Sequence, residues 1–283
     1  MGINYDDVMG LTSRRQVSWT ERDAIIYALG VGIADDPMDE RELPFVREGS
    51  PKVVPTFPVV VGFGGGALAK VGLDYRQVLH GEQAVTLYRP FPAEGTAIAE
   101  GRMIGAWDKG PGKGAVFAEE RRLLLANGDP LASVVTTAFG RAEGGFGGPS
   151  SGQPKPHVMP ARAPDNVIEI DTLPKQALLY RLSGDLNPLH INPASATASG
   201  FPRPILHGLC TFAICCRGVL MAYCDYDPTR IRHHQARFSA PVFPGERIRI
   251  ELWRDGDTVS FQAHVPAREA VVIKSGKAII SAS

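Results

Sequence analysis

The amino-acid sequence predicts an α+β protein made of two similar halves, each a buried helix wrapped by an antiparallel sheet. Three observations predict this fold class. Short motifs recur along the chain at a nearly constant offset, and residues 205–223 form an apolar stretch too long for a strand but suited to a buried helix. Segments of alternating polarity follow at residues 247–253 and 259–265, and Asp255-Gly256 between them is typical of a hairpin turn.

The recurring motifs indicate an internal duplication. Each motif of the first half has a counterpart about 152 residues later, in the same order, and chance matching of short apolar strings is the alternative. The three pairs are Tyr27-Ala-Leu-Gly30 with Tyr180-Arg-Leu-Ser-Gly184, Val53–Phe57 with Ile205–Leu209, and Arg89–Thr96 with Ala240–Arg247.

Each half is expected to open with a helix. Thr20 and Asp23 fit a capping box ahead of apolar residues at helical spacing, and Pro174 suits the first turn of the corresponding helix in the second half. In the first half, the apolar segment expected to form the central helix is interrupted by the run Gly62–Ala67. Each glycine costs about 1 kcal/mol in a helix interior, so a bent or broken helix is expected here.

Residues 140–165 divide the chain. They contain six glycines and five prolines and show no hydrophobic periodicity, which is typical of a linker. We therefore expect an N-terminal repeat over residues 1–139 and a C-terminal repeat over residues 166–283, each of ordinary domain size.

The composition narrows the class of protein and its partners. Thirty basic and thirty acidic residues give a formal net charge of zero, which removes the electrostatic argument for a nucleic-acid or anionic-membrane partner. No apolar run reaches the roughly 18 residues that span a bilayer, and no secretory signal is visible, so a cytoplasmic location is expected. The four cysteines are expected to be reduced and buried in one helix, and no metal or redox cofactor is expected. They are Cys210, Cys215, Cys216 and Cys224.

The segment Leu179–Pro193 carries the residues suited to chemistry. Gly184 can close the preceding helix and Pro188 disfavours helical backbone at Asn187, so Asp185 and His190 are expected on an irregular loop. A carboxylate and an imidazole supply two proton-transfer groups, and the amide of Asn187 could orient a water. Most isolated Asp-His pairs are structural, but the density of polar and turn residues on this apolar-flanked loop favours a site.

The sequence Ser-Gly-Asp-Leu-Asn-Pro-Leu-His at residues 183–190 resembles the signature of MaoC-like, (R)-specific enoyl-CoA hydratases, the hydratase 2 family. The resemblance continues through residues 198–201 and 204–212, and residues 27–32, 78–83 and 108–110 resemble the two-repeat members, as in the hydratase part of peroxisomal multifunctional enzymes of type 2. It implies a double hot-dog fold and reversible addition of water to trans-2-enoyl-CoA, giving (3R)-3-hydroxyacyl-CoA.

This chemistry suits the residues present. Carbon 3 is electrophilic only while the thioester carbonyl is polarised, so donors must stabilise an enolate-like charge. Gly208, at the start of the buried helix, offers an N–H with the helix dipole behind it, and the resemblance implies that it forms the oxyanion hole. We expect Asp185 and His190 to hold the water, with His190 taking its proton. Which group delivers a proton to carbon 2 is left open.

The first half has lost the corresponding residues. An offset of about 152 from Asp185 and His190 leads to Ile33 and Met38, and Thr56 stands in place of the glycine. We therefore expect one active site per chain, with the first repeat forming the wall of an acyl and pantetheine tunnel.

The resemblance assigns further binding and supporting residues. Phe238 could instead be a core residue, Lys109 an exposed turn residue and Glu48 an ion-pair partner. The positions implied to contact the CoA substrate are His80, Gly81, Lys109 and Phe238, and those implied to support the site are Tyr27 and Glu48.

Three other functions remain to be weighed. A (3R)-hydroxyacyl-carrier-protein dehydratase would use the same residues in the reverse direction, and a non-catalytic acyl-CoA-binding module would not need Asp185 or His190. A hot-dog thioesterase would not explain the whole loop. The sequence leaves acyl chain length, pathway, direction and a homodimeric state open.

Overall fold

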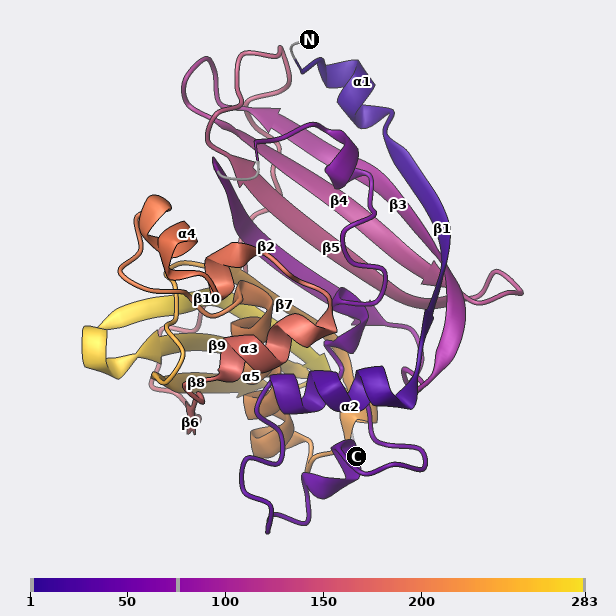
Figure 1. The fold of residues 1–283 in the computed structure, drawn as a ribbon, viewed down its shortest axis with the longest axis vertical. Coiled ribbons are helices and arrows are strands. Elements are labelled where there is room, and N and C mark those ends of the chain that lie inside the picture. Colours follow the sequence, from indigo (N-terminus) through magenta and orange to yellow (C-terminus); the bar gives the residue numbers. More distant parts are fainter. Residues whose placement is uncertain (1–2, 75–76, 282–283) are drawn as a thin grey trace.

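The computed structural model describes residues 3–74 and 77–281, and Figure 1 shows its helices and strands. The strands are β1 Thr12–Trp19, β2 Val78–Leu87, β3 Gly95–Asp108, β4 Ala115–Leu124, β5 Pro130–Gly140, β6 Asn166–Asp171, β7 Ile231–Phe238, β8 Arg247–Asp255, β9 Thr258–Val265 and β10 Ala270–Ile280. The α-helices are α1 Tyr5–Met9, α2 Glu21–Gly30, α3 Gln176–Tyr180, α4 Pro193–Ala198 and α5 Gly208–Tyr223. Within the described residues, each helix is too short or too polar to span a bilayer.

These strands form one antiparallel sheet in the order β1-β3-β4-β5-β2-β7-β10-β9-β8-β6. Read from its outer edge to the centre, the first half has the order β1-β3-β4-β5-β2. The second half, read from the other edge, has the equivalent order β6-β8-β9-β10-β7. The two sets meet at β2 and β7, where Glu82 lies opposite Arg237 and Thr86 opposite His233. The predicted α+β class and its two-repeat, double hot-dog arrangement are confirmed.

Helix α5 is the central helix of the second half and packs on β7 to β10. Its side chains from Leu209 to Leu220 are buried, and Phe212 accepts a hydrogen bond from His234 of β7 through its carbonyl oxygen (3.1 Å). The helix begins at Gly208 rather than at residue 205, because the backbone before it is extended and Leu206 donates to Val242 (2.7 Å). The four cysteines are free and buried; Cys210, Cys215 and Cys216 lie within α5 as predicted, and Cys224 immediately follows it.

The prediction of a central helix in the first half is wrong. Residues 53–74 hold only the short 3-10 helices Phe57–Val59 and Leu68–Lys70, because Pro55 and Pro58 lack N–H groups and Gly62 and Gly64 adopt left-handed backbone. Figure 1 shows this segment running in front of the strands β3 to β5.

Two buried charged side chains of β4 hold this irregular segment. Arg121 donates to the carbonyl oxygens of Pro58, Val59 and Gly62, while the Glu119 carboxylate accepts from the N–H groups of Ala67 and Leu68. Non-helical backbone needs such partners when it is buried, because its own polar groups are not paired along the chain. Burial lowers the pKa of Arg121 to about 10, which still leaves it charged at neutral pH.

The glycine run fits tightly against these charged groups. A Cβ atom on Gly66 would lie 2.0 Å from Glu119 Oε1, and one on Gly65 would lie 2.3 Å from Arg15 Cζ. The run therefore permits a close approach to β1 and β4. Its predicted role in opening a tunnel remains a proposal.

Residues 141–165 contain no helix or strand. Residues 152–157 line a cavity with His233 and Gln235 of β7, whose intervening residue His234 faces α5, so the segment crosses the opposite face of the sheet. The N–H groups of Gly145 and Gly147 donate to the Asp108 carboxylate at one end of this crossing. Further along, His157 Nε2 lies 2.7 Å from the hydroxyl of Ser260, whose neighbours in β9 face the core. The segment is thus a strap across the outer face.

A buried ion pair ties the first half to α5. Arg217 donates from Nε and Nη2 to the two carboxylate oxygens of Glu42 at 2.7 and 2.8 Å, and Glu42 is 2% exposed. Glu42 also accepts from the N–H of Ala34 (2.8 Å). A single arginine in an otherwise apolar helix was the sequence signal for such a partner.

We expect Glu42→Gln to lower the free energy of unfolding by about 3–5 kcal/mol, because it leaves the Arg217 charge buried without a counter-charge. Denaturant unfolding would measure the loss. The double variant Glu42→Gln/Arg217→Met should recover much of it, and an exposed control, Glu40→Gln, should change little. A loss below about 1 kcal/mol in Glu42→Gln would contradict a stabilising role for the pair.

Candidate active site

The loop after α3 presents the predicted catalytic residues. Gly184 ends the helical turn with φ of 116°, a left-handed conformation that suits glycine. Asp185 Oδ1 then accepts from the N–H of Asn187 (3.1 Å), and Asn187 Oδ1 accepts from the N–H of Leu189 (3.0 Å), which caps the 3-10 helix Pro188–His190. These local bonds fix the loop so that His190 is buried while Asp185 stays half-exposed.

The structure brings Asp185 and His190 together and adds a second imidazole, that of His207. One carboxylate oxygen and one ring nitrogen from each histidine lie within 4.8 Å of one another. The two imidazole rings are stacked, with centroids 3.7 Å apart and planes 27° apart. Such donors could also bind a metal ion, so the absence of a metal requirement stays a prediction.

Backbone carbonyls define which nitrogen of each ring carries hydrogen. His190 Nδ1 lies 2.9 Å from the carbonyl oxygen of Ile205, and His207 Nε2 lies 3.2 Å from the carbonyl oxygen of Asp185. A carbonyl oxygen only accepts, so each of these nitrogens donates. In the neutral ring of His190, Nε2 therefore keeps a lone pair that can take a proton from water.

Burial keeps both histidines neutral. It lowers the pKa of His190 below the usual imidazole value, against the opposing effects of the Ile205 hydrogen bond and the Asp185 charge. Burial, with the neighbouring His190, lowers the pKa of His207 to about 3. A neutral His190 at physiological pH is the form that a general base requires.

Gly208 lies beside this cluster and is the first residue of α5. Its N–H therefore has no acceptor within the helix. A Cβ atom here would lie 3.2 Å from the ring of Phe238. The Phe238 ring in turn contacts that of His80, with centroids 4.7 Å apart. The structure therefore places three predicted residues from three separate elements side by side.

His80 is held by an oriented amide. Its Nε2 lies 3.1 Å from Gln83 Oε1, while the Gln83 amide nitrogen donates to the carbonyl oxygens of Ala84 and Val135. Burial lowers the pKa of His80 to about 4. His80 is thus a neutral imidazole whose Nε2–H donates to Gln83. Gly81 follows it in β2, where a Cβ would approach Thr137 O to 3.3 Å.

Tyr27, a predicted supporting residue, is linked to the site from the first half by ring contacts. Its hydroxyl donates to Thr56 Oγ1 (3.0 Å), and its ring contacts that of Tyr180, which contacts that of His207. Figure 1 shows α2 and α3, which carry Tyr27 and Tyr180, side by side. Thr56, predicted to replace the catalytic glycine, is buried and occupied by this hydrogen bond.

Three further predicted residues lie away from the buried cluster. Glu48 is exposed on a loop, whereas the nearby Glu42 is buried and pairs with Arg217, so the supporting role of Glu48 stays a prediction. Asn187 is exposed and its oxygen is used within the loop, so only its amide nitrogen could orient a water. Lys109 donates to Ser150 O in the strap (3.2 Å), and no hydrogen bond among the described residues joins it to the loop.

A cavity of about 750 Å³ lies between the strap and the outer face of the sheet. It reaches Gly81 and Phe238, at the place where β2 and β7 stop pairing, and its walls include the indole of Trp107. Basic side chains around it are Lys155 of the strap, Arg237 of β7 and Lys274 of β10. This cavity is not apparent from the sequence, because its walls come from segments that are distant along the chain.

Comparison with known proteins defines the family. A MaoC like domain matches residues 157–275, and an MFE-2 hydratase 2 N-terminal domain matches residues 17–142. The chain belongs to the MaoC-like hydratase 2 family, as the sequence resemblance indicated.

Individual relatives agree with this assignment. A protein of Arabidopsis thaliana named enoyl-CoA hydratase 2, peroxisomal, is 39% identical over 275 residues, which cover 90% of this chain and 88% of the relative. The crystal structure of a MaoC-like dehydratase from Phytophthora capsici is 32% identical, covers 99% of this chain and 98% of its own, and gives a TM-score of 0.87. A Mycobacterium tuberculosis protein described as a double hotdog fold is 14% identical over 97% of each chain, with a TM-score of 0.56, and supports the fold alone.

Proposed function

We propose that this protein is an (R)-specific 2-enoyl-CoA hydratase, a hydro-lyase of fatty acid metabolism that adds water reversibly to trans-2-enoyl-CoA to give (3R)-3-hydroxyacyl-CoA. The observation that carries the proposal is the neutral, buried His190 beside Asp185, with the first N–H of α5 close by. The family assignment and the Arabidopsis relative support it.

The geometry performs this reaction with few groups. A water held by Asp185 and His190 loses its proton to His190 Nε2 as its oxygen bonds to carbon 3. The electrons of the double bond move toward the thioester oxygen, where the Gly208 N–H and the dipole of α5 stabilise the negative charge. Carbon 2 then takes a proton from the Asp185–His190 pair, which collapses the enolate and returns the pair to its starting protonation state, whichever of the two groups delivers it.

A spectroscopic assay tests this function directly. Loss of the conjugated enoyl-thioester absorbance should follow addition of the protein, and chiral analysis should find the (3R) product alone. No loss of absorbance with four- to twelve-carbon substrates would contradict enzymatic hydration and favour the acyl-CoA-binding module. A (3S) product would contradict the stereochemical assignment. Faster turnover of the carrier-protein thioester than of the CoA thioester would favour the dehydratase alternative.

The cavity under the strap supports CoA as the carrier. Gly81 and Phe238, which resemblance assigns to CoA binding, line it together with Lys155, Arg237 and Lys274. The phosphates of the CoA nucleotide are attracted by basic side chains. Arg237 already forms an ion pair with Glu82, so its charge is partly neutralised. Lys155 and Lys274 are both exposed, and we assign them to the CoA phosphates.

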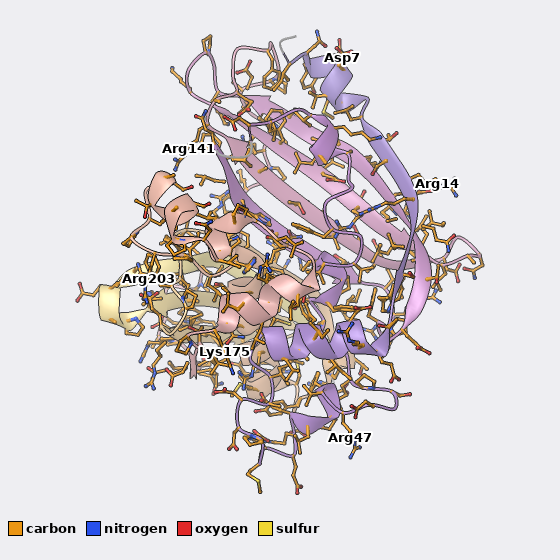
Figure 2. The ribbon with its side chains drawn as sticks, in the orientation of Figure 1. Asp7, Arg14, Arg47, Arg141, Lys175 and Arg203 are labelled. Atoms are coloured by element: carbon orange, nitrogen blue, oxygen red, sulfur yellow. The ribbon has the colours of Figure 1, made fainter. Side chains whose placement is uncertain are left out.

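The double variant Lys155→Gln/Lys274→Gln should raise KM for enoyl-CoA about tenfold, or about 1.4 kcal/mol, with kcat nearly unchanged. Steady-state kinetics at low ionic strength would measure this, since salt screens exposed charges. The matched control is Lys175→Gln, an exposed lysine beside α3 (Figure 2). An enoyl-pantetheine substrate, which lacks the nucleotide, should show no difference. A KM for enoyl-CoA within twofold of the parent value would place the nucleotide elsewhere.

We also expect the enzyme to accept medium or long acyl chains. The first half has lost both the catalytic loop and the central helix, and the irregular segment in its place is held by side chains rather than by helical bonds. Each methylene buried beside it would add roughly 0.8 kcal/mol of binding. Catalytic efficiency should rise from four-carbon to about ten-carbon substrates in a chain-length series. A maximum at four carbons with a steady decline would contradict the tunnel and leave the catalytic pair untouched.

Location and assembly remain proposals. Four reduced cysteines suit a reducing compartment, and we propose a cytoplasmic location, although the Arabidopsis relative is named as peroxisomal. A homodimer stays a prediction, as does a reaction that needs no cofactor beyond the CoA thioester itself.

A further inference from the structure

His207 lies at the centre of the site, yet it is neither the proposed base nor the proposed oxyanion donor. It is 1% exposed, and its ring is enclosed by the rings of His190 at 3.7 Å and Tyr180 at 5.0 Å. Its Nδ1 is buried and has no hydrogen-bond partner among the described residues. Burying a polar nitrogen in this way is costly, which calls for a compensating role.

The two histidines make reciprocal connections between two separate segments. His190 belongs to the catalytic loop and donates to Ile205, which precedes α5. His207 immediately precedes α5 and donates to Asp185, the first catalytic residue of the loop. Between the two segments the chain makes a largely exposed excursion over residues 191–204, which includes α4. The two hydrogen bonds therefore join the chain segments on either side of residues 191–204.

We propose that His207 is a positioning residue that forms a reciprocal clamp with His190 and so sets the catalytic loop against the N–H of Gly208. The inference rests on the proposed hydratase function. A base and an oxyanion donor must face the same substrate within a few tenths of an ångström, and the clamp joins the segments that carry them. Because each ring donates from a different nitrogen, the stacked histidines are opposite tautomers: His190 carries hydrogen on Nδ1 and His207 on Nε2.

The tautomers can be tested on the parent protein, with variants used only to assign the signals. Nitrogen-15 NMR of histidine-labelled parent protein at pH 7 should show one ring of each neutral tautomer for this pair, assigned by loss of signals in His190→Gln and His207→Gln. Two rings of the same tautomer, or a charged His207, would overturn the clamp. This measurement does not depend on turnover, so it can succeed even if the protein proves not to be a hydratase.

Kinetics test the positioning role. His207→Phe keeps a planar ring in the stack but removes the donor to Asp185, and kcat should fall about 10–100-fold with KM changed less than threefold. His207→Gln keeps an N–H donor and should restore most of kcat. The groups facing the ring are His190, Asp185, Tyr180 and Arg181, and all of them are retained in both variants.

A double-mutant cycle separates positioning from a merely structural role. If His207 acts through His190, His207→Phe should have little further effect on kcat in the His190→Gln background. Multiplying effects, or equal losses in the Phe and Gln variants with a matching fall in Tm, would overturn the proposal. So would a normal kcat in His207→Phe with its fold confirmed.

Discussion

Replacement of Asp185 by Asn or of His190 by Gln should lower kcat by about 10² to 10⁴-fold, the usual contribution of a general acid–base group. Both changes remove a proton-transfer group. Asp185→Asn keeps the oxygen that accepts from the Asn187 N–H, and the backbone carbonyl that holds His207 is unaffected, so the fold should persist. Circular dichroism and thermal unfolding would check the fold, and the enoyl-thioester assay would give kcat.

The pH profile supplies a second readout for the same pair. Because burial lowers the pKa of His190, its neutral form persists to lower pH than for an ordinary imidazole. Activity should therefore decline only as pH falls below about 6.5, the unperturbed value, and His190→Gln should lose this acid limb. An exposed carboxylate, Asp257→Asn, is the matched control. Near-normal kcat in a folded Asp185 or His190 variant would refute the mechanism.

The second large effect is expected at Gly208. A valine there would direct its branched side chain at the Phe238 ring, since even a Cβ atom lies 3.2 Å from it, and would occupy space that the thioester oxygen needs. Loss of one oxyanion donor costs roughly 10²–10³-fold in kcat, so Gly208→Val should lower kcat by at least this much. Single-turnover kinetics would isolate the chemical step.

The corresponding first-half variant, Thr56→Val, provides the comparison. It removes the acceptor of the Tyr27 hydroxyl and should cost about 1 kcal/mol of stability, with kcat changed only a few-fold. Equal losses of kcat at both positions would mean that both halves carry working sites, contrary to the loss of the Asp and His from the first repeat.

Features governed by local sequence were predictable. Thr20 and Asp23 form the full capping box, since the short-range bonds depend on residues three apart. The strands β8 and β9 match the alternating segments, and Gly256 adopts the left-handed backbone of the predicted turn. The conformation of the catalytic loop was also predictable, because the turn residues that determine it all lie within the seven residues 184–190.

Features that depend on distant partners were not predictable. The apolar segment after Val53 has the composition of a helix, and its actual path depends on Arg121 and Glu119 of a strand more than fifty residues later. Glu48 and Glu42 cannot be distinguished without knowing where Arg217 lies. His207 is adjacent to Gly208 in the sequence, but its stacking on His190 could not be predicted. The stacking depends on how residues 191–204 bring the two segments together.

The shared sheet has a consequence for how the chain folds. One apolar core runs through both halves, from Trp19 and Tyr27 to Phe261 and Ile280, and the Glu42–Arg217 ion pair crosses between them. Either half alone would leave Glu42 or Arg217 without its partner and its innermost strand, β2 or β7, without one neighbour. The two repeats are therefore expected to unfold together in a single cooperative transition, although they are duplicated segments. The first repeat could lose its catalytic residues, but neither repeat is expected to fold without the other.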